Sequence, residues 1–154
     1  MKLLASQNPF DLKAALLQGH AQHPVIIHFP IALFIASAVF ELLALWRKQP
    51  VFASVAYYNL LGAVLTLPFA IATGVGAWRL QLEGAALKGN LMLHLICALS
   101  SASLIFFLSW MRWRCRVKGI SPGLAYFAVT LLALMMITLT GHLGGILSGV
   151  ETPG

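Results

Sequence analysis

The sequence is poor in charged residues: ten Lys or Arg and four Asp or Glu make up 9% of its 154 residues. Soluble globular proteins carry roughly 25% charged residues, which keep the folded surface hydrated. Here 60% of the residues are hydrophobic and the mean hydropathy is +0.88. The scarcity of charge therefore excludes a soluble catalytic domain and, in spite of a pI of 9.8, a protein that binds nucleic acid.

Cysteine is scarce as well. The sequence contains Cys97 and Cys115, which lie roughly 18 residues apart, or about 27 Å along a helix. A disulfide needs Cα atoms within about 7 Å, so we expect these two cysteines to be unbridged. This excludes a secreted module held together by disulfides. The apolar patch at residues 3–5 is too short for the hydrophobic region of a signal peptide.

The few charged residues leave four long uncharged runs between them. These runs cover residues 14–40, 49–78, 89–111 and 119–150. Each is longer than the roughly 18 to 20 apolar residues that a helix needs to cross about 30 Å of hydrocarbon. Because the connections are short, the runs predict an all-α integral membrane protein with four transmembrane helices in an antiparallel up-down bundle.

The chain is expected to divide into three parts. Residues 23–150 form the four-helix transmembrane domain, and residues 151–154 form a tail. Residues 1–22 precede the first span at the outer face of the membrane. Within them, residues 9–19 have the apolar spacing of a short interfacial helix, and an unstructured tail is the alternative.

Basic residues gather in two loops that lie on the same side of the predicted bundle. Loops 47–50 and 112–121 together hold six Lys or Arg and no acidic residue. On the opposite side, four basic residues are diluted by Asp11, Glu83 and Glu151. Short loops rich in Lys and Arg stay in the cytoplasm. The two basic loops are therefore predicted to be cytoplasmic, with both termini on the outer side.

Three histidines are predicted to lie at one depth near the outer face. His28 and His94 follow the starts of the first and third spans by about one turn, and His142 precedes the end of the fourth. At about 1.5 Å per residue, each is roughly 6 to 8 Å inside the membrane edge. His23 lies slightly closer to the outer face. Ionisable groups at such depth are costly and are candidates for function.

Imidazoles from facing helices, with small residues beside them, are typical of b-type haem sites in helical bundles. We expect two of His28, His94 and His142 to be axial ligands, with His23 as an alternative ligand or a residue that orients one. Two histidine ligands fill the two coordination positions that a porphyrin leaves open on its iron, which favours an electron carrier over an enzyme. An electron carrier at the outer face suggests a quinol or a periplasmic c-type cytochrome as partner. The predicted cofactor-binding residues are His28, His94, His142, Gly74, Gly141, Gly144 and Gly145.

Two other interpretations of the histidines remain open. Imidazole also suits copper, zinc and iron ions. In that case His28, His94, His142 and His23 would be the metal ligands, with Met92 as a soft auxiliary ligand in a copper- or iron-handling protein. Alternatively, the imidazoles hydrogen-bond carbonyls or hydroxyls of neighbouring helices, and the chain is a non-catalytic structural or assembly subunit of a larger membrane complex.

Glu41 is the one carboxylate within a predicted span. A long charged side chain near the end of a span extends towards the interface or pairs with a basic group. We expect Glu41 to reach towards Arg47, Lys48 or Arg112. Asn59 lies at similar depth on the second helix and is a candidate hydrogen-bond partner.

Several segments of the sequence resemble one family. They are residues 23–33 (His-Pro-Val-Ile-Ile-His-Phe-Pro-Ile-Ala-Leu) with Glu41 downstream, Thr73-Gly74, His94, and residues 140–145 (Thr-Gly-His-Leu-Gly-Gly). Over residues 20–150 the chain resembles small bacterial membrane proteins catalogued as domain of unknown function 2231. The family's tail continues into a Val-Tyr or similar pair, where this chain has Leu-Ser-Gly-Val at residues 147–150.

The resemblance implies a four-helix protein of the bacterial inner membrane without an established activity. Some relatives look fused to c-type cytochrome segments, which favours a redox role by association.

Overall fold

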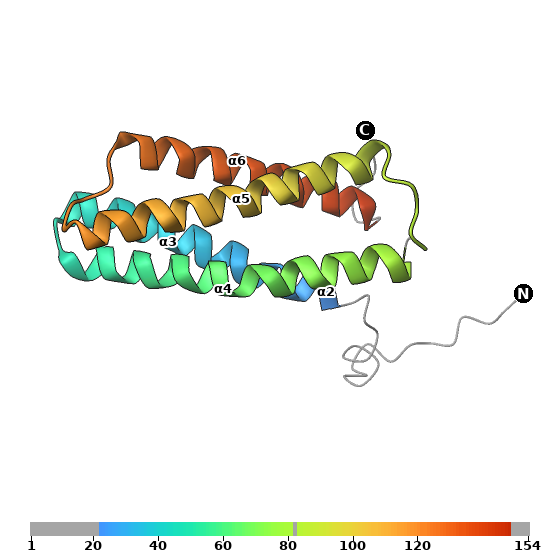
Figure 1. Ribbon diagram of the computed structural model, residues 1–154, viewed down its shortest axis with the longest axis horizontal. Helices are drawn as coiled ribbons and strands as arrows, with labels where there is room; N and C mark the ends of the chain where they lie inside the picture. The colour runs from blue at the N-terminus through green and yellow to red at the C-terminus, as the bar shows by residue number, and fades with distance from the viewer. Residues whose placement is uncertain (1–21, 82, 149–154) are drawn as a thin grey trace, which may run out of the picture.

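The computed structural model describes residues 22–81 and 83–148. Within these ranges every regular element is a helix, and the helices form an antiparallel bundle (Figure 1). The predicted fold class is confirmed, whereas the expected helix at residues 9–19 and the tail at residues 151–154 lie outside the described residues. The helices are α2 (Gln22–Ile26), α3 (His28–Arg47), α4 (Pro50–Gln81), α5 (Gly89–Val117) and α6 (Leu124–Leu147).

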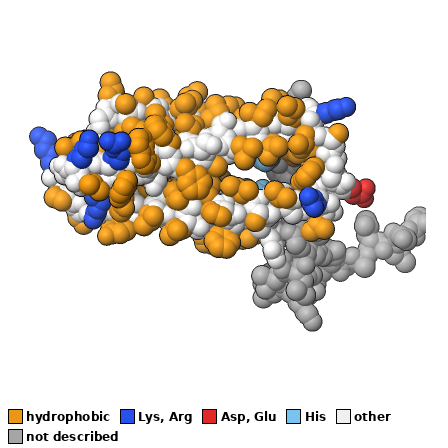
Figure 2. Space-filling view, in the orientation of Figure 1, with side chains coloured by type: hydrophobic (Ala, Val, Ile, Leu, Met, Phe, Trp, Pro, Cys, Tyr) orange, Lys and Arg blue, Asp and Glu red, His pale blue; other side chains and the backbone are white. Residues whose placement is uncertain are grey.

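Four segments are long and apolar enough to cross a membrane. They have 26, 31, 29 and 24 residues, with α2 and α3 together forming the first. No more than 22% of the most apolar part of each segment is buried inside the bundle. The rest of these apolar surfaces faces outward, and hydrophobic side chains cover much of the face in Figure 2. Such a surface requires a lipid bilayer around it.

The bundle has two ends of different character. The basic end is formed by the α3–α4 connection and by residues 118–123 between α5 and α6. The histidine end is the opposite one, where residues 83–88 join α4 to α5. Lys and Arg side chains gather at the basic end on the left of Figure 2.

The first span is interrupted, although its sequence predicts one continuous helix. Pro30 lacks the N–H that would bond the Ile26 carbonyl, so the hydrogen-bond ladder fails there. The helix breaks at Ile27, whose N–H still bonds the His23 carbonyl at 3.1 Å. The short α2 that results packs against α4, and this contact brings the His23 side chain to the wall of α4.

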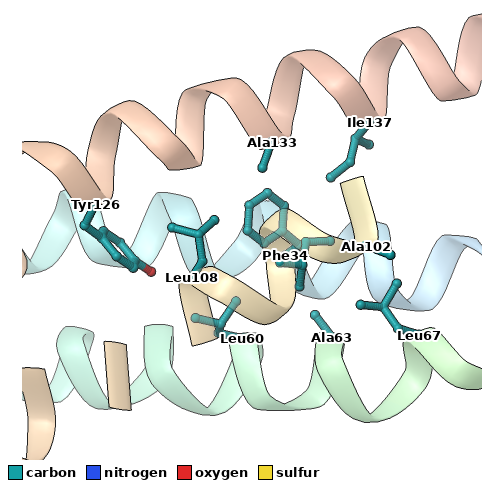
Figure 3. Close-up of a cluster of buried hydrophobic side chains, with 10 residues drawn as sticks. Phe34, Leu60, Ala63, Leu67, Ala102, Leu108, Tyr126, Ala133 and Ile137 are labelled. Atoms are coloured by element: carbon teal, nitrogen blue, oxygen red, sulfur yellow. The ribbon is translucent and has the colours of Figure 1, made fainter. Parts of the chain in front are cut away.

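The four spans pack as two hairpins. α3 packs mainly on α4, and α5 packs mainly on α6, while contacts between the two hairpins are fewer. A buried apolar cluster joins the hairpins in the middle of the bundle (Figure 3). Several of its members are alanines, which let the helix backbones approach closely. The cluster consists of Phe34, Leu60, Ala63, Leu67, Ala102, Ile105, Leu108, Tyr126, Ala133 and Ile137.

A buried ion pair joins the hairpins towards the basic end. Nε of Arg112 donates to Oε2 of Glu41 at 2.8 Å, and the two side chains are only 6% and 3% exposed. Nη2 of Arg112 also donates to the carbonyl of Ala53 at 3.2 Å. Three helices, α3, α4 and α5, are therefore linked through one guanidinium.

This geometry confirms Arg112, one of the three predicted partners of Glu41, and corrects other expectations about this region. Arg112 was expected in a cytoplasmic loop, but α5 continues to Val117, so Arg112 lies inside the bundle. Glu41 does not reach the interface, because Arg112 holds it in the interior. Asn59 donates to the Val55 carbonyl of its own helix at 2.9 Å instead of bonding Glu41.

Replacing Arg112 with Leu should strongly destabilise the protein. The substitution leaves the Glu41 carboxylate buried without a partner, and breaking a buried pair in this way costs about 3–5 kcal/mol. The melting temperature of the detergent-purified protein should fall clearly. Arg114→Leu, two residues away on an exposed side chain, is the matched control and should have little effect. Equal losses for Arg112→Leu and Arg114→Leu would contradict the role of the pair.

Candidate functional site

The two hairpins separate towards the histidine end. The buried residues of α5 begin at Ser101 and those of α6 end at Ile137, so the parts nearer this end are half-buried or exposed. Figure 2 shows the surface hollowed between the hairpins in this region, with histidine side chains visible inside the hollow. His23 and His94 are half-buried, come from different hairpins, and lie at the same end of the bundle.

His23 is oriented by α4. Its Nδ1 lies 3.1 Å from Oγ1 of Thr73. The Thr73 hydroxyl itself lies 3.0 Å from the carbonyls of Phe69 and Ala70, one turn back in the same helix. A hydroxyl has one proton to donate, and these carbonyls can only accept. Thr73 therefore accepts from His23, so Nδ1 of His23 carries the proton and Nε2 of the neutral ring carries the lone pair.

His94 is oriented by α6 in a similar way. Its Nδ1 lies 3.1 Å from the backbone carbonyl of Thr140. Because a carbonyl only accepts, Nδ1 of His94 is the donor and Nε2 again carries the lone pair. The hydroxyl of Thr140 donates to the backbone carbonyl of Met136 at 2.7 Å and lies 3.4 Å from the hydroxyl of Ser101. The Thr140 carbonyl that receives His94 is thus held in a hydrogen-bonded segment.

Each imidazole lies against a glycine. A Cβ at Gly74 would be 3.0 Å from Cε1 of His23, and a Cβ at Gly144 would be 3.3 Å from Cε1 of His94. Both distances are shorter than ordinary van der Waals contact. Only glycine therefore lets each ring lie directly on the helix backbone without a shift.

The two hairpins have a similar arrangement with two differences. In each one, a histidine near the start of the first span bonds a threonine late in the second span and lies on a nearby glycine. His23 bonds the side chain of Thr73 and lies on the next residue, Gly74, whereas His94 bonds the backbone carbonyl of Thr140 and lies on Gly144, four residues further on. The histidine and threonine are 50 residues apart in the first hairpin and 46 in the second. We call these residues together the histidine site: His23, Thr73, Gly74, His94, Thr140 and Gly144.

Sequence reasoning did not find this arrangement. Each unit consists of three residues separated by long apolar runs, so the signal in the sequence is small. The recurrence of Thr-Gly at residues 73–74 and 140–141 marks both threonines, but Gly141 is not the glycine on which His94 lies. The corresponding roles become visible only when the structure brings each pair of helices together.

The structure places the other predicted residues differently. His28 is exposed, and its Nδ1 donates to the carbonyl of Pro24 in the preceding turn. His142 is exposed on α6. A Cβ at Gly141 would meet nothing within 4 Å, and Gly145 is half-buried near the end of α6. All ligand roles remain predictions; His28 and His142 are exposed, whereas His23 and His94 are half-buried.

The histidine site is limited in what it can bind. Within residues 22–81 and 83–148, no group of three or more His, Cys, Asp or Glu is placed to hold a metal ion. Met92, the expected auxiliary ligand, is exposed and stands two residues before His94, a spacing that does not share a helix face. Metal sites made by protein alone usually have three or four ligands. Two imidazoles instead suit a metal whose remaining positions are filled by a non-protein ligand.

The comparisons with known proteins identify a family. Residues 19–151 match a family described as "Predicted membrane protein (DUF2231)". Searches of the curated proteins and of the solved structures found no match. The matched range includes all four spans and both units of the histidine site. The chain therefore belongs to the DUF2231 family of membrane proteins.

Proposed function

We propose that the protein binds b-type haem between the two hairpins, with His23 and His94 as axial ligands, and that it carries electrons. One observation carries the proposal: each hairpin supplies one half-buried imidazole to the same end of the bundle. The proposal retains His94 from the sequence prediction and takes His23, the alternative ligand, as its partner.

The orientation of the imidazoles supports ligation. A histidine that ligates a metal usually donates its other ring N–H to a carbonyl, carboxylate or water, which fixes the ring and makes the free nitrogen more basic. His94 donates from Nδ1 to the Thr140 carbonyl, and His23 donates from Nδ1 to the Thr73 hydroxyl. Nε2 is then the ligating atom in both.

The number of ligands and the space around them also favour haem. A porphyrin supplies four equatorial nitrogens, so two protein ligands complete the six positions of the iron. Gly74 and Gly144 bring the rings against the helix backbones, and a Cβ at Gly76 would meet nothing within 4 Å. These small residues are consistent with a flat macrocycle placed between the helices.

The chemistry expected of such a site is electron transfer. Held by His23 and His94, a haem would have no open position for oxygen and would supply one-electron redox chemistry. With the histidine end at the outer face, as the basic loops predict, the partner would be a quinol or a periplasmic c-type cytochrome. What this chain itself contributes is orientation of the ligands and exclusion of water.

A second candidate function is a structural subunit of a membrane complex. The hydrogen bonds of His23 and His94 each connect two helices within one hairpin, as expected for histidines that only stabilise packing. A structural subunit would show no haem spectrum, and His94→Ala would impair complex assembly. A third candidate function is copper handling. Elemental analysis distinguishes it from haem binding, because a copper-handling protein would contain stoichiometric copper in place of iron.

The visible spectrum tests haem binding directly. The purified protein, reconstituted with haem in detergent, should show a Soret band and α and β bands that sharpen on reduction with dithionite. His23→Ala and His94→Ala should each abolish the six-coordinate spectrum, because each removes an axial ligand.

His28→Ala and His142→Ala are the matched controls, because both side chains are exposed, and they should retain the spectrum. A wild-type protein that stays colourless after reconstitution with haem would contradict the proposal. Loss of the spectrum in His28→Ala or His142→Ala with His23→Ala unaffected would return the ligand role to the residues first expected from the sequence.

Glycine substitutions test the packing of the rings. Gly74→Ala and Gly144→Ala should lower haem occupancy several-fold, since the new methyl group displaces His23 or His94 from the helix wall. Ala in place of helical Gly otherwise stabilises a helix by roughly 0.5–1 kcal/mol, so a loss would come from the contact between the methyl group and the ring. Gly141→Ala, where the added Cβ has open space, should retain full occupancy. Equal occupancy in all three variants would show that the rings do not depend on these glycines.

A further inference from the structure

We propose that the basic end carries a binding site for an anionic phospholipid on the last turns of α5. A shallow hollow of about 340 Å³ lies there. The inference is independent of haem binding, because the hollow is at the opposite end of the bundle from the histidine site. We call this hollow the lipid site, and its lining residues are Trp110, Trp113, Arg114, Val117 and Lys118.

The basic end has positive charge that the described residues do not neutralise. Of the two acidic residues in residues 22–81 and 83–148, Glu41 is paired with Arg112, and Glu83 lies at the histidine end. Lys and Arg side chains gather at the basic end in Figure 2, and no acidic side chain is visible among them on that face. Such an excess attracts the anionic lipids of a membrane leaflet. The cations at this end for which the described residues provide no carboxylate are Arg47, Lys48, Arg114, Arg116 and Lys118.

The basic residues at the end of α5 point in three directions. Arg112 is turned inward to Glu41. Arg116 lies over the rings of Tyr57 and Tyr58, at 4.7 and 5.7 Å from their centroids. Arg114 and Lys118 are four residues apart, so they share one face of the helix, and both line the hollow. Two basic residues, Arg114 and Lys118, therefore lie on one concave surface.

The chemistry of this pair suits a phosphate group. A guanidinium donates in a fork that matches two phosphate oxygens, and an ammonium adds a second positive charge. The guanidinium of Arg114 lies 5.0 Å from the ring centroid of Trp110, which keeps it against the hollow. A phosphate between Arg114 and Lys118 would sit at the level where α5 leaves the membrane.

The apolar lining indicates that the phosphate belongs to a lipid. Trp110 and Trp113 are 47% and 53% exposed, so both indole rings are accessible to an acyl chain. The ring of Phe107 stacks on Trp110 at 5.6 Å and extends the apolar surface towards the middle of the membrane. A headgroup at the cations and an acyl chain along Trp110 and Phe107 follow the polarity of a phospholipid. A free phosphate would use only the first half of this surface.

Native mass spectrometry of the full-length protein in detergent tests the inference. With phosphatidylglycerol and phosphatidylcholine of identical acyl chains added together, phosphatidylglycerol should remain bound preferentially. Arg114→Gln combined with Lys118→Gln should weaken its binding about 30-fold, from two charges that act near the membrane surface. Arg79→Gln combined with Lys88→Gln removes the same charge at the histidine end and should leave binding unchanged. Inorganic phosphate in excess should not displace the lipid.

Three results would overturn the inference. They are equal retention of the two lipids by the wild-type protein, equal loss of lipid in the two double variants, and displacement by inorganic phosphate. The last would mean an anion site without a lipid tail. The comparison of lipids and the phosphate competition use the wild-type protein, so they decide the question even if a double variant fails to fold.

Discussion

The hydrocarbon interior of the membrane does not hydrogen-bond to polar groups, so this protein must satisfy each of them internally. Helices satisfy the backbone, and the polar side chains follow the same constraint. The Ser37 hydroxyl donates to the carbonyl of Ala56 on the neighbouring helix at 2.8 Å. The Thr130 hydroxyl donates to the backbone carbonyl of Tyr126, one turn back, at 2.8 Å. Among the described residues, no buried side-chain nitrogen or oxygen lacks a partner. Polar residues that are not needed for packing therefore stand out as candidates for function.

The same constraint gives the two ends of the bundle different structures. Towards the basic end, the Glu41–Arg112 pair and the buried apolar cluster hold the hairpins together. Towards the histidine end, α5 and α6 have no further buried residues, and the hairpins separate. The hairpins are thus held together towards one end of the bundle and apart at the end that carries the two imidazoles. The break in the first span at Pro30 completes the site, because it sets the short helix that carries His23 against α4.

The predicted fold was largely correct because four long uncharged runs leave few alternatives in a membrane. The helix limits were less accurate: α5 runs six residues past the expected end of its uncharged run at residue 111, to Val117. The candidate site was harder to predict. Counting residues along each span placed His28, His94 and His142 at one depth, but depth does not tell which face of a helix a side chain occupies. His23 was ranked below them, although the structure holds it half-buried against α4 at the same end of the bundle as His94.

By itself, the sequence determined that the chain spans a membrane four times, that its basic residues gather at one end, and that its ionisable residues inside the spans are few. These properties follow from composition and order along the chain. Only the tertiary structure decided which of three basic residues pairs with Glu41, and that His23 and His94 lie on Gly74 and Gly144. Each of these depends on how far a helix is rotated about its own axis. That rotation is set by packing between residues distant in the chain, which the order of residues along one helix does not specify.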